Sequence, residues 1–409
     1  MEYNNLKVLI IGTDINAYYM ARCYNELTGK KADLIGKEKM AFTSVSKITN
    51  IQIEPNLWDD KTFLKVLLEY ADKNKDYRLL LIGTNDNYVK LISKNEKILE
   101  KYFSFNYPNI ELINNLLIKE NFYNIYKDMG IDMPKTYIYP CNQNKDINEI
   151  NNYFSEYPII IKPSDGIEYH HLDEVLDKVY KAKNYEELKN IIKKIEKAGY
   201  NNNLIIQEFI PGDDSALYDS LFYVGKDNKA KLATFAQIGL QEHTPTGIGN
   251  CTVLVNGFDE HGYKEELVYK LKEFIEKIGY KGFAEFDIKY DMRDNKYKVL
   301  EINPRQSRSG YYMCACGYNL VETLINDLIY NKKMKFKIIK EKYVLSFVPK
   351  KIIKKYINNK LLKIEINNLI KNKKIINPLK YKKDMSFKRI KYMFLRDKNY
   401  IKKYKKYIF

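Results

Sequence analysis

One pair of strands near residue 300 carries acidic and amide side chains at a spacing that suits metal binding. The segment reads "GFAEFDIKYDMRDNKYKVLEINPR", two apolar runs joined by a turn at 292–296. Because side chains of a strand alternate between its two faces, Glu285 and Asp287 share a face of the first strand. For the same reason Glu301 and Asn303 share a face of the second. Carboxylate and amide oxygens that meet across a hairpin would suit Mg²⁺, with phosphate and water as its other ligands. Taken alone, these positions could equally be ordinary polar positions that face solvent.

Basic residues lie close to this hairpin and upstream of it. Arg305 and Arg308 follow the second strand, and cations just beyond a metal site can neutralise a polyphosphate or an acyl phosphate. Lys162 ends an apolar strand in "IIIKPSDG", ahead of a glycine-containing turn. Its ammonium and nearby backbone N–H groups could hold phosphates. A lysine at the end of a strand is common, so Lys162 is a weak indication by itself.

The elements that must position these residues fall into three segments. Over 1–114, buried strands alternate with helices, which predicts an open parallel α/β domain. Ligands of such sheets bind at the carboxyl ends of the strands, here near 13–16 and 84–86. Asp14 and Asn16 could therefore contact a small ligand. Asn16 could also cap the following helix, which we favour.

The mixed strands and helices of 115–330 predict an α+β catalytic module, and 331–409 forms a basic C-terminal extension. The extension has 27 Lys and Arg against four acidic residues, a charge of +23, which leaves −6 for the other residues of a chain whose net charge is +17. Such an extension could be a solvated, partly helical surface. It could also bind an anionic partner, namely a membrane, a nucleic acid or a phosphorylated substrate.

Composition narrows the classes of protein to consider. No apolar run approaches the roughly 18 residues of a membrane span, and the first residues do not resemble a signal peptide. Five scattered cysteines and four histidines, with no CxxC, argue against a zinc site and indicate a reduced, cytoplasmic compartment. The acidic body and the lack of a recognisable nucleic-acid-binding motif disfavour a protein that binds nucleic acid through its basic extension.

In their order and spacing, Lys119, Lys162, "QEFIPGDD", Asp287 and "EINPR" resemble the ATP-grasp ligases. Three further stretches are similar to the D-aspartate ligase branch of the carboxylate–amine ligases: "IIGTDINAYYMARCYNELTG", "KPSDGIEYHH" and "QEHTPTGIGN". The resemblance implies that 1–114 is a pre-ATP-grasp domain and 115–330 the ATP-grasp module. The chain departs from the family in having a single glycine in the loop after Lys162, and Gln207 where an acid is frequent.

The resemblance also implies a role for individual residues. ATP would be held through its phosphates by Lys119 and Lys162, through its adenine by Gln207, Phe209 and Ile210, and through its ribose by Asp214. Two Mg²⁺ ions would be bound by Asp287, Glu301 and Asn303, and Arg305 would steady the transferred phosphate.

The activity implied by the resemblance is formation of an amide through an acyl phosphate, with ATP and Mg²⁺. The amino-acid donor would be D-aspartate, through its β-carboxylate, and the acceptor the lysine ε-amine of a peptidoglycan precursor. Another amino-acid or dipeptide ligase is the alternative. Arg308 is our candidate clamp for the α-carboxylate, with Glu242 on the amino group, while His243 could line the pocket or belong to a local loop. We also expect the basic extension to bring the enzyme to the inner face of an anionic membrane.

Overall fold

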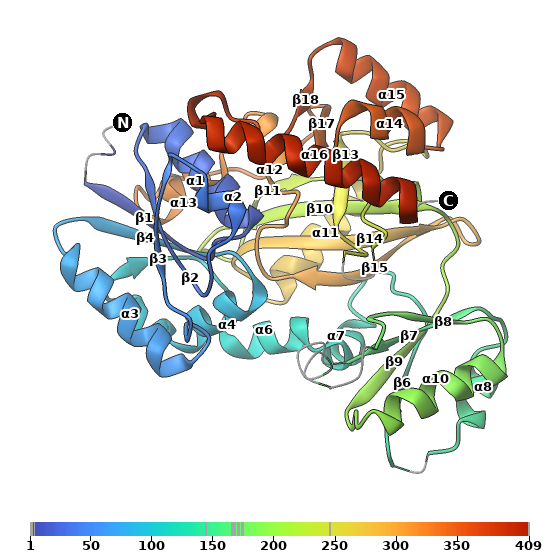
Figure 1. Cartoon of the computed structure of the whole chain (residues 1–409). Helices are drawn as coiled ribbons and strands as arrows, with labels where there is room; N and C mark the ends of the chain where they lie inside the picture. The colour runs from blue at the N-terminus through green and yellow to red at the C-terminus, as the bar shows by residue number, and fades with distance from the viewer. Residues whose placement is uncertain are drawn as a thin grey trace.

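The structure is a computed structural model, and it describes residues 3, 5–143, 145–164, 169, 172, 176–244 and 247–407. Within these residues the chain forms three sheets. Figure 1 shows the N-terminal domain at the left, a small lobe at the lower right and the largest sheet between them, with helices of the C-terminal segment above. No helix in the described part of the chain combines the length and the apolar character that crossing a membrane requires.

The N-terminal domain is a five-stranded parallel sheet with the order β3-β2-β1-β4-β5, as the alternation of strands and helices predicted. Its strands are β1 (Leu6–Ile11), β2 (Ala32–Gly36), β3 (Thr49–Ile53), β4 (Arg78–Gly83) and β5 (Phe103–Ser104). Its helices are α1 (Ile15–Thr28), α2 (Ala41–Ser44), α3 (Asp60–Lys73), α4 (Asp86–Lys94) and α5 (Glu96–Leu99). The carboxyl ends of β1 and β4, which are neighbours, bring Asp14 and Asp86 to the same edge of the sheet.

The helix cap predicted at Asn16 is wrong. Helix α1 begins at Ile15, so Asp14 occupies the N-cap position, and its carboxylate accepts from the Ala17 N–H at 2.9 Å. Asn16 lies inside the first turn, where its Nδ2 donates to the Thr84 carbonyl at 2.9 Å. Asn16 thus joins the ends of β1 and β4 rather than satisfying the start of α1.

Two helices link the first domain to the rest of the chain: α6 (Ile110–Leu117) and α7 (Lys119–Tyr126). The apolar pattern of "LLIKENFYNIYKDMG" (116–130) by itself predicts one helix that ends at Gly130. The chain breaks at Ile118, whose backbone is extended, and this break places Lys119 in the first turn of α7. The boundary expected at residue 114 falls within α6.

The small lobe is a four-stranded antiparallel sheet with the order β6-β9-β7-β8. Its strands are β6 (Thr136–Pro140), β7 (Ile159–Pro163), β8 (Tyr180–Ala182) and β9 (Asn203–Glu208), and its helices are α8 (Asn148–Tyr153) and α10 (Tyr185–Lys197). Apolar side chains on one face of α10 pack on this sheet, notably Leu188, Ile192 and Ile195. The lobe carries Lys162 on β7 and Gln207 on β9, in adjacent strands.

The largest sheet has nine strands, with the path β15-β14-β10-β12-β13-β17-β18 and with β11 and β16 attached beside β10. The strands before the C-terminal segment are β10 (Leu217–Val224), β11 (Ala230–Thr234), β12 (Ala236–Gln241), β13 (Cys251–Asn256), β14 (Gly282–Asp291) and β15 (Lys296–Asn303). The helices of this region are α11 (Glu265–Lys277), α12 (Tyr311–Ala315) and α13 (Leu320–Leu328). The predicted hairpin is confirmed as β14 and β15, with Asp287 opposite Glu301 and Glu285 opposite Asn303.

Residues 331–409, expected as a basic extension, contribute three strands to the same sheet: β16 (Lys337–Ile339), β17 (Tyr343–Ser346) and β18 (Ile375–Ile376). The helices of the segment are α14 (Lys350–Tyr356), α15 (Lys360–Lys371) and α16 (Phe387–Tyr407). Helix α16 lies across the front of the molecule in Figure 1. Arg389 in α16 is fully buried, forms an ion pair with buried Asp384 at 3.2 Å, and lies 3.8 Å from the ring centre of Tyr18 in α1. The segment is therefore packed onto the N-terminal domain.

Candidate active site

The predicted metal ligands lie together on β14 and β15, and the neighbouring strand β10 adds a further carboxylate. Asp287 pairs in register with Glu301 on one side and with Asp219 on the other. Asn303 Nδ2 donates to Glu285 at 2.7 Å and to Asp287 at 3.2 Å. Burial, together with the adjacent carboxylates, raises the pKa of Glu285 and of Asp287 well above its usual range. Asp219 and Glu285 are both buried. The sequence placed Glu285 on the same face as Asp287 without assigning it as a ligand, and it did not indicate Asp219.

This set of donors fits Mg²⁺. In the described part of the chain, no three acidic, histidine or cysteine side chains could hold an ion on their own. Mg²⁺ commonly takes one or two protein carboxylates and completes its octahedron with phosphate and water. Asp287 and Glu301 offer such a partial set, and the mutual repulsion of the carboxylates would be relieved by a dication. Asn303 turns its Nδ2 toward Asp287 while its Oδ1 accepts from Arg305, so its amide group must turn over to offer an oxygen to an ion.

Two predicted phosphate-binding lysines approach these carboxylates from different elements. Lys119 Nζ, on α7, lies 3.7 Å from Glu301 Oε2, and Lys162 Nζ, on β7, lies 3.3 Å from Gln207 Oε1. Burial lowers the pKa of Lys162 to about 8. Lys119 and Lys178 act in the same direction, whereas Glu301 and Asp287 act to raise this pKa. Burial acts to raise the pKa of Glu301, but Lys119 and Lys162 outweigh it and lower this pKa to about 2. The lysines thus face the carboxylates across a site where phosphates could bind the lysines directly and the carboxylates through a metal ion.

The residues predicted to surround the adenine lie at the end of β9 and just beyond it. Gln207 is buried, and its Nε2 donates to Thr136 Oγ1 at 2.9 Å. Ile210 is also buried, whereas the Phe209 ring lies 3.7 Å from the ammonium of Lys181. The amide of Gln207 therefore connects the predicted adenine position to Lys162.

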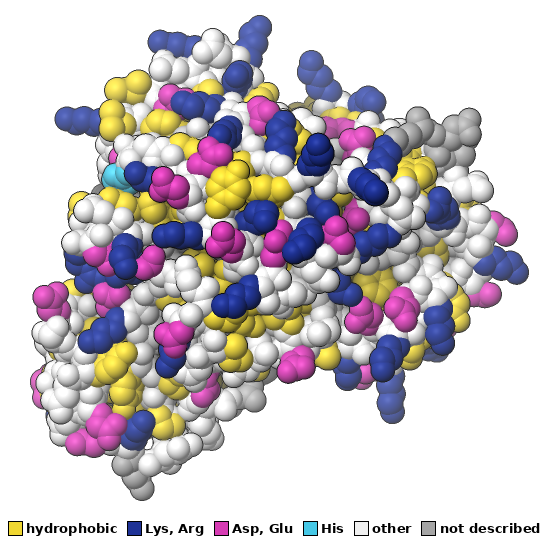
Figure 2. All heavy atoms as spheres, turned by 180° about the vertical axis from the view of Figure 1, so that it is seen from behind, with side chains coloured by type: hydrophobic (Ala, Val, Ile, Leu, Met, Phe, Trp, Pro, Cys, Tyr) yellow, Lys and Arg dark blue, Asp and Glu magenta, His cyan; other side chains and the backbone are white. Residues whose placement is uncertain are grey.

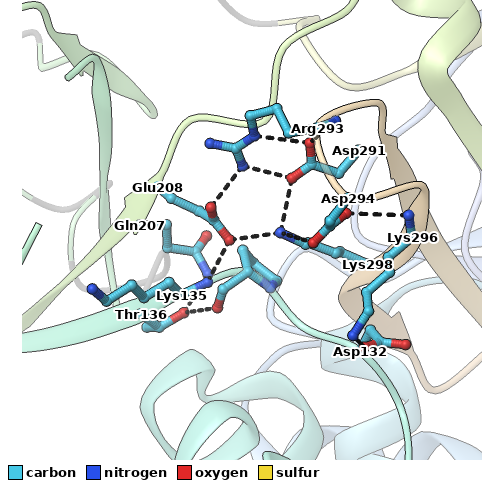
Figure 3. Close-up of polar contacts among 11 residues, drawn as sticks. Asp132, Lys135, Thr136, Gln207, Glu208, Asp291, Arg293, Asp294, Lys296 and Lys298 are labelled. Atoms are coloured by element: carbon cyan, nitrogen blue, oxygen red, sulfur yellow. Dashed lines mark hydrogen bonds and ion pairs between the residues drawn. The ribbon is translucent and has the colours of Figure 1, made fainter. Parts of the chain in front are cut away.

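An ion-pair network fixes β9 against the hairpin of the large sheet. Glu208, which follows Gln207, accepts from Arg293 at 2.6 Å and from Lys298 at 3.0 Å. Both cations also bind the buried carboxylate of Asp291, at 2.5 and 2.8 Å. Figure 3 shows these side chains converging from the two sheets. Hydrogen bonds from Arg293 outweigh burial and lower the pKa of Asp291, and the network holds the predicted adenine residues at a fixed position relative to the metal ligands.

Asp214, predicted to bind the ribose, is already engaged by three N–H groups. It accepts from the Gln241 backbone N–H at 2.9 Å, from Gln241 Nε2 at 3.1 Å and from His243 Nε2 at 2.9 Å. The hydrogen bond that His243 donates to Asp214 raises the pKa of His243 despite its burial. The structure therefore pairs His243 with Asp214.

Arg305 joins the N-terminal domain to the β14–β15 hairpin, which carries the predicted metal ligands Asp287, Glu301 and Asn303 and is called the metal hairpin below. Its Nε donates to Asp86 at 2.7 Å, and its Nη2 donates to Asn303 Oδ1 at 3.2 Å. Burial acts to lower the pKa of Arg305, but Asp86 and Glu285 outweigh it and raise this pKa. Asp86 was missed as a site residue, although it lies at the strand end where the sequence placed ligand binding.

Arg308 and Glu242, predicted separately as substrate residues, form a direct pair. Arg308 Nη2 donates to Glu242 Oε1 at 3.0 Å, and Tyr400 OH donates to the same carboxylate oxygen at 2.7 Å. Lys403 Nζ lies 3.6 Å from Glu242 Oε2. Burial acts to raise the pKa of Glu242, but Arg308, Tyr400 and Lys403 outweigh it and lower this pKa.

A buried carboxylate holds the loop around Arg308. Asp219 accepts from Ser309 Oγ at 2.5 Å and from Tyr312 OH at 2.8 Å, and Ser307 Oγ lies 3.5 Å away. Because Asp219 is also the register partner of Asp287, the loop that carries Arg308 is anchored beside the metal hairpin. The guanidinium then projects toward α16.

A cavity of about 460 Å³ opens beside Arg308 and Glu242, and α16 forms much of its wall. The α16 residues of the wall include Tyr392, Arg396, Asn399, Tyr400 and Lys403. None of them was predicted as a site residue. Their sequence context is a lysine-rich segment, in which they are indistinguishable from solvated surface.

Comparisons with known proteins identify the family of the chain. The profile described as "ATP-grasp domain" matches residues 119–309. The chain is 34% identical over 335 residues to a protein of Enterococcus faecium (strain Aus0004) named D-aspartate ligase, and the match covers 79% of this chain and 77% of that protein.

Solved structures share the fold at low sequence identity. An N5-carboxyaminoimidazole synthetase from Staphylococcus aureus, complexed with ADP, matches with a TM-score of 0.62 and 15% identity, covering 90% of this chain and 87% of that one. An L-amino acid ligase from Bacillus licheniformis matches with a TM-score of 0.57 and 14% identity, covering 80% and 75%. The biotin carboxylase domain of the Hydrogenobacter thermophilus 2-oxoglutarate carboxylase, solved with MgADP, matches with a TM-score of 0.62 and 14% identity, covering 81% and 71%.

Proposed function

Because the chain belongs to the ATP-grasp carboxylate–amine ligases and to their D-aspartate ligase branch, we propose that it joins the β-carboxylate of D-aspartate to the ε-amine of a lysine in a peptidoglycan precursor. The observation that carries this proposal is the 34% identity to D-aspartate ligase over 77% of that protein. The pairing of Arg308 with Glu242 beside the metal hairpin supports it.

The chemistry requires activation of a poor electrophile. A carboxylate oxygen attacks the γ-phosphorus of ATP and ADP leaves; the amine then attacks the carbonyl carbon, phosphate leaves, and the amine loses a proton. Lys119 and Lys162 hold the nucleotide phosphates in this scheme. Asp287, Glu301 and Asn303 would hold Mg²⁺, which would neutralise the charge of the phosphoryl group. The number of ions stays a prediction.

Arg305 is positioned to steady the transferred phosphate. Asp86 and Asn303 fix its guanidinium beside the metal ligands, so the arginine is in place before the phosphoryl group arrives. Arg305 therefore connects the N-terminal domain, through Asp86, to the large sheet, through Asn303. In this scheme the N-terminal domain contributes to catalysis by positioning Arg305.

A D-aspartate pocket needs an anion-binding and a cation-binding group side by side. Arg308 can donate two hydrogen bonds to the α-carboxylate, and Glu242 can accept from the α-ammonium group. The two side chains lie side by side, since they contact each other at 3.0 Å. Bound D-aspartate would replace the contact between Arg308 and Glu242. Its α-carboxylate would neutralise Arg308, and its α-ammonium group would neutralise Glu242. The β-carboxylate would then point toward Arg305 and the metal hairpin.

A screen of phosphate release tests the amino-acid donor. Full-length protein with ATP and Mg²⁺ is offered D- and L-aspartate, D-alanine, D-glutamate and a panel of other L-amino acids, with and without a muramyl-pentapeptide acceptor. We expect D-aspartate to stimulate phosphate release most. Preference for an L-amino acid would instead support the alternative, another amino-acid or dipeptide ligase, and no stimulation by any amino acid would refute both.

We also place the enzyme in the cytoplasm, at the inner face of the membrane, through α16. Three of its large apolar side chains recur at helical spacing and face solvent: Phe387 (83% exposed), Ile390 (50%) and Phe394 (57%). Lysines flank this stripe, and each basic residue at an anionic surface contributes about 1 kcal/mol. On the opposite face of the molecule, basic and acidic side chains are interspersed (Figure 2).

Co-sedimentation with liposomes tests this contact. The intact protein should bind phosphatidylglycerol vesicles more than phosphatidylcholine vesicles, and less at high salt. Phe394→Glu should weaken binding, whereas Met292→Glu, at an exposed apolar residue in the β14–β15 turn, should not. Equal sedimentation on both vesicles, or equal effects of the two substitutions, would count against the proposal.

A further inference from the structure

Helix α16 forms a wall of the cavity that contains the Arg308–Glu242 pair. The pair lies on the side of the metal hairpin, since Ser307 and Ser309 anchor the loop of Arg308 to Asp219. The facing side consists of α16 and of Phe42 from α2. The cavity therefore extends from the catalytic residues to a helix that has no assigned role in the reaction.

The α16 side of the cavity carries positive charge without a matching acidic partner. Arg396 donates to the Phe347 carbonyl at 2.9 Å and to Tyr400 OH at 3.0 Å. It forms no ion pair with an acidic side chain among the residues that the structure describes. Lys403 shares Glu242 with Arg308, so this one carboxylate faces more cations than it can neutralise. An anionic ligand would balance this charge.

The cavity is larger than a four-carbon amino acid needs. Its volume of about 460 Å³ falls in the range of roughly 300–1,000 Å³ that binds molecules of drug size. The rings of Phe42, Tyr392 and Tyr400 supply apolar surface between the cations of α16 and the Arg308 side. This combination suits a ligand with an aliphatic stretch between an anionic end and the reacting end.

We propose that this cavity binds the amine acceptor, and that Arg396 and Lys403 hold a carboxylate or phosphate group of that acceptor while its amine reaches the Arg308 side. This inference rests on the proposed ligase function. It assigns the specificity for the acceptor to α16, and it defines the acceptor class as an amine that carries an anionic group beyond an aliphatic stretch.

The experiment separates carboxylate activation from acceptor binding by using two kinds of nucleophile. Full-length protein receives ATP, Mg²⁺ and D-aspartate. Hydroxylamine, small and uncharged at neutral pH, traps the acyl phosphate as a hydroxamate without needing the α16 side. The alternative nucleophiles are lysine tripeptides with a free C-terminal carboxylate, with a C-terminal amide, or with a C-terminal amide and a phosphoserine.

We expect Arg396→Ala and Lys403→Ala each to raise the apparent KM for an anionic peptide about tenfold, the effect of losing one charge-assisted hydrogen bond. Hydroxamate formation at saturating D-aspartate and the KM for ATP should be unchanged for Arg396→Ala. Lys403→Ala also removes a cation beside Glu242, so its effect is read from the ratio of ligation to hydroxamate formation. Lys402→Ala is the matched control, because Lys402 is the exposed neighbour of Lys403 and does not line the cavity. The KM for the carboxylate peptide and the KM for the phosphoserine peptide are compared in the two variants. The peptide whose KM rises more shows whether α16 binds a carboxylate or a phosphate.

Several results would overturn the inference. A fall in hydroxamate formation parallel to the fall in ligation would place α16 in activation or in folding, and melting temperatures distinguish these two. If Lys402→Ala raised the KM for the anionic peptide as much as Lys403→Ala does, α16 would act only through its overall positive charge and not through a specific binding site. Hydroxamate formation by the wild type without selection among the three peptides would refute the acceptor site and leave the ligase function standing. Absence of hydroxamate with every amino-acid donor would refute the ligase function itself.

Discussion

Replacing Arg308 by lysine should weaken binding of the amino-acid donor more than binding of ATP. Arg308 Nη2 donates to Glu242 and Tyr400, whereas its buried Nε has no hydrogen-bond partner among the described residues. A carboxylate can therefore accept from Nε and from a second nitrogen of the same guanidinium. Lysine offers one ammonium, which cannot reproduce this planar pair of hydrogen bonds.

The expected magnitude follows from the loss of one charge-assisted bond, about 1.5–3 kcal/mol, which corresponds to roughly a 10- to 100-fold rise in the apparent KM for D-aspartate. The predicted ATP ligands Lys119 and Lys162 lie on other elements, so the KM for ATP should stay near the wild-type value. Phosphate release is measured with each substrate varied while the other is saturating, after a melting curve has shown that the variant is folded.

Two outcomes would refute this reasoning. An equal rise in the KM for ATP and for D-aspartate would mean that Arg308 acts on the site as a whole. An unchanged KM for D-aspartate would mean that the α-carboxylate binds elsewhere. Either result would refute the role of Arg308 as a clamp for the α-carboxylate. The activation chemistry at the metal hairpin is tested separately, by Asp287→Asn and Glu301→Ala.

Asp287→Asn and Glu301→Ala should each abolish turnover without lowering the melting temperature, because they remove metal ligands on partly exposed positions and no core packing; near-normal ADP formation by a folded variant would contradict the assignment. The value of kcat/KM for ATP should fall above pH 8, because the pKa of Lys162 is about 8 and the lysine loses its proton there; Lys162→Arg should remove this alkaline fall, and an unchanged profile would exclude Lys162 as its source. Asp384→Asn should destabilise the protein by about 3–5 kcal/mol in urea unfolding, because it leaves Arg389 buried without its counterion; a loss below 1 kcal/mol would mean that the pair is dispensable.

The metal hairpin could be predicted from the sequence because its geometry depends on local spacing. Side chains two residues apart share a face of a strand, and a short turn sets which strand positions oppose each other. Asp287, Glu301 and Asn303 accordingly lie together as expected. Lys119 is a contrast, since nothing in the apolar pattern marks the break at Ile118 that starts a separate helix. Its approach to Glu301 depends on that break.

Other site residues depend on contacts between distant segments, which local patterns do not encode. Asp219 lies on β10, and only the pairing of β10 with β14 brings it beside Asp287. Asp86 meets Arg305 across 219 positions of sequence, and Tyr400 meets Glu242 across 158. For Asp86 a general rule on parallel sheets indicated the right region, although not the partner. For Tyr400 no comparable rule exists.

The basic C-terminal segment shows why a charge count alone misleads about function. Its cations divide by the face of the helix that they occupy: Arg389 is buried against Asp384, Arg396 and Lys403 line the cavity, and Lys402 faces solvent. Only exposed residues such as Lys402 can attract an anionic membrane simply as surface charge. Because Tyr400 hydrogen-bonds with Arg396 and with Glu242 on the two sides of the cavity, a shift of α16 relative to the large sheet must change the cavity. Whatever binds the outer face of α16 therefore acts on a helix that is already part of the site.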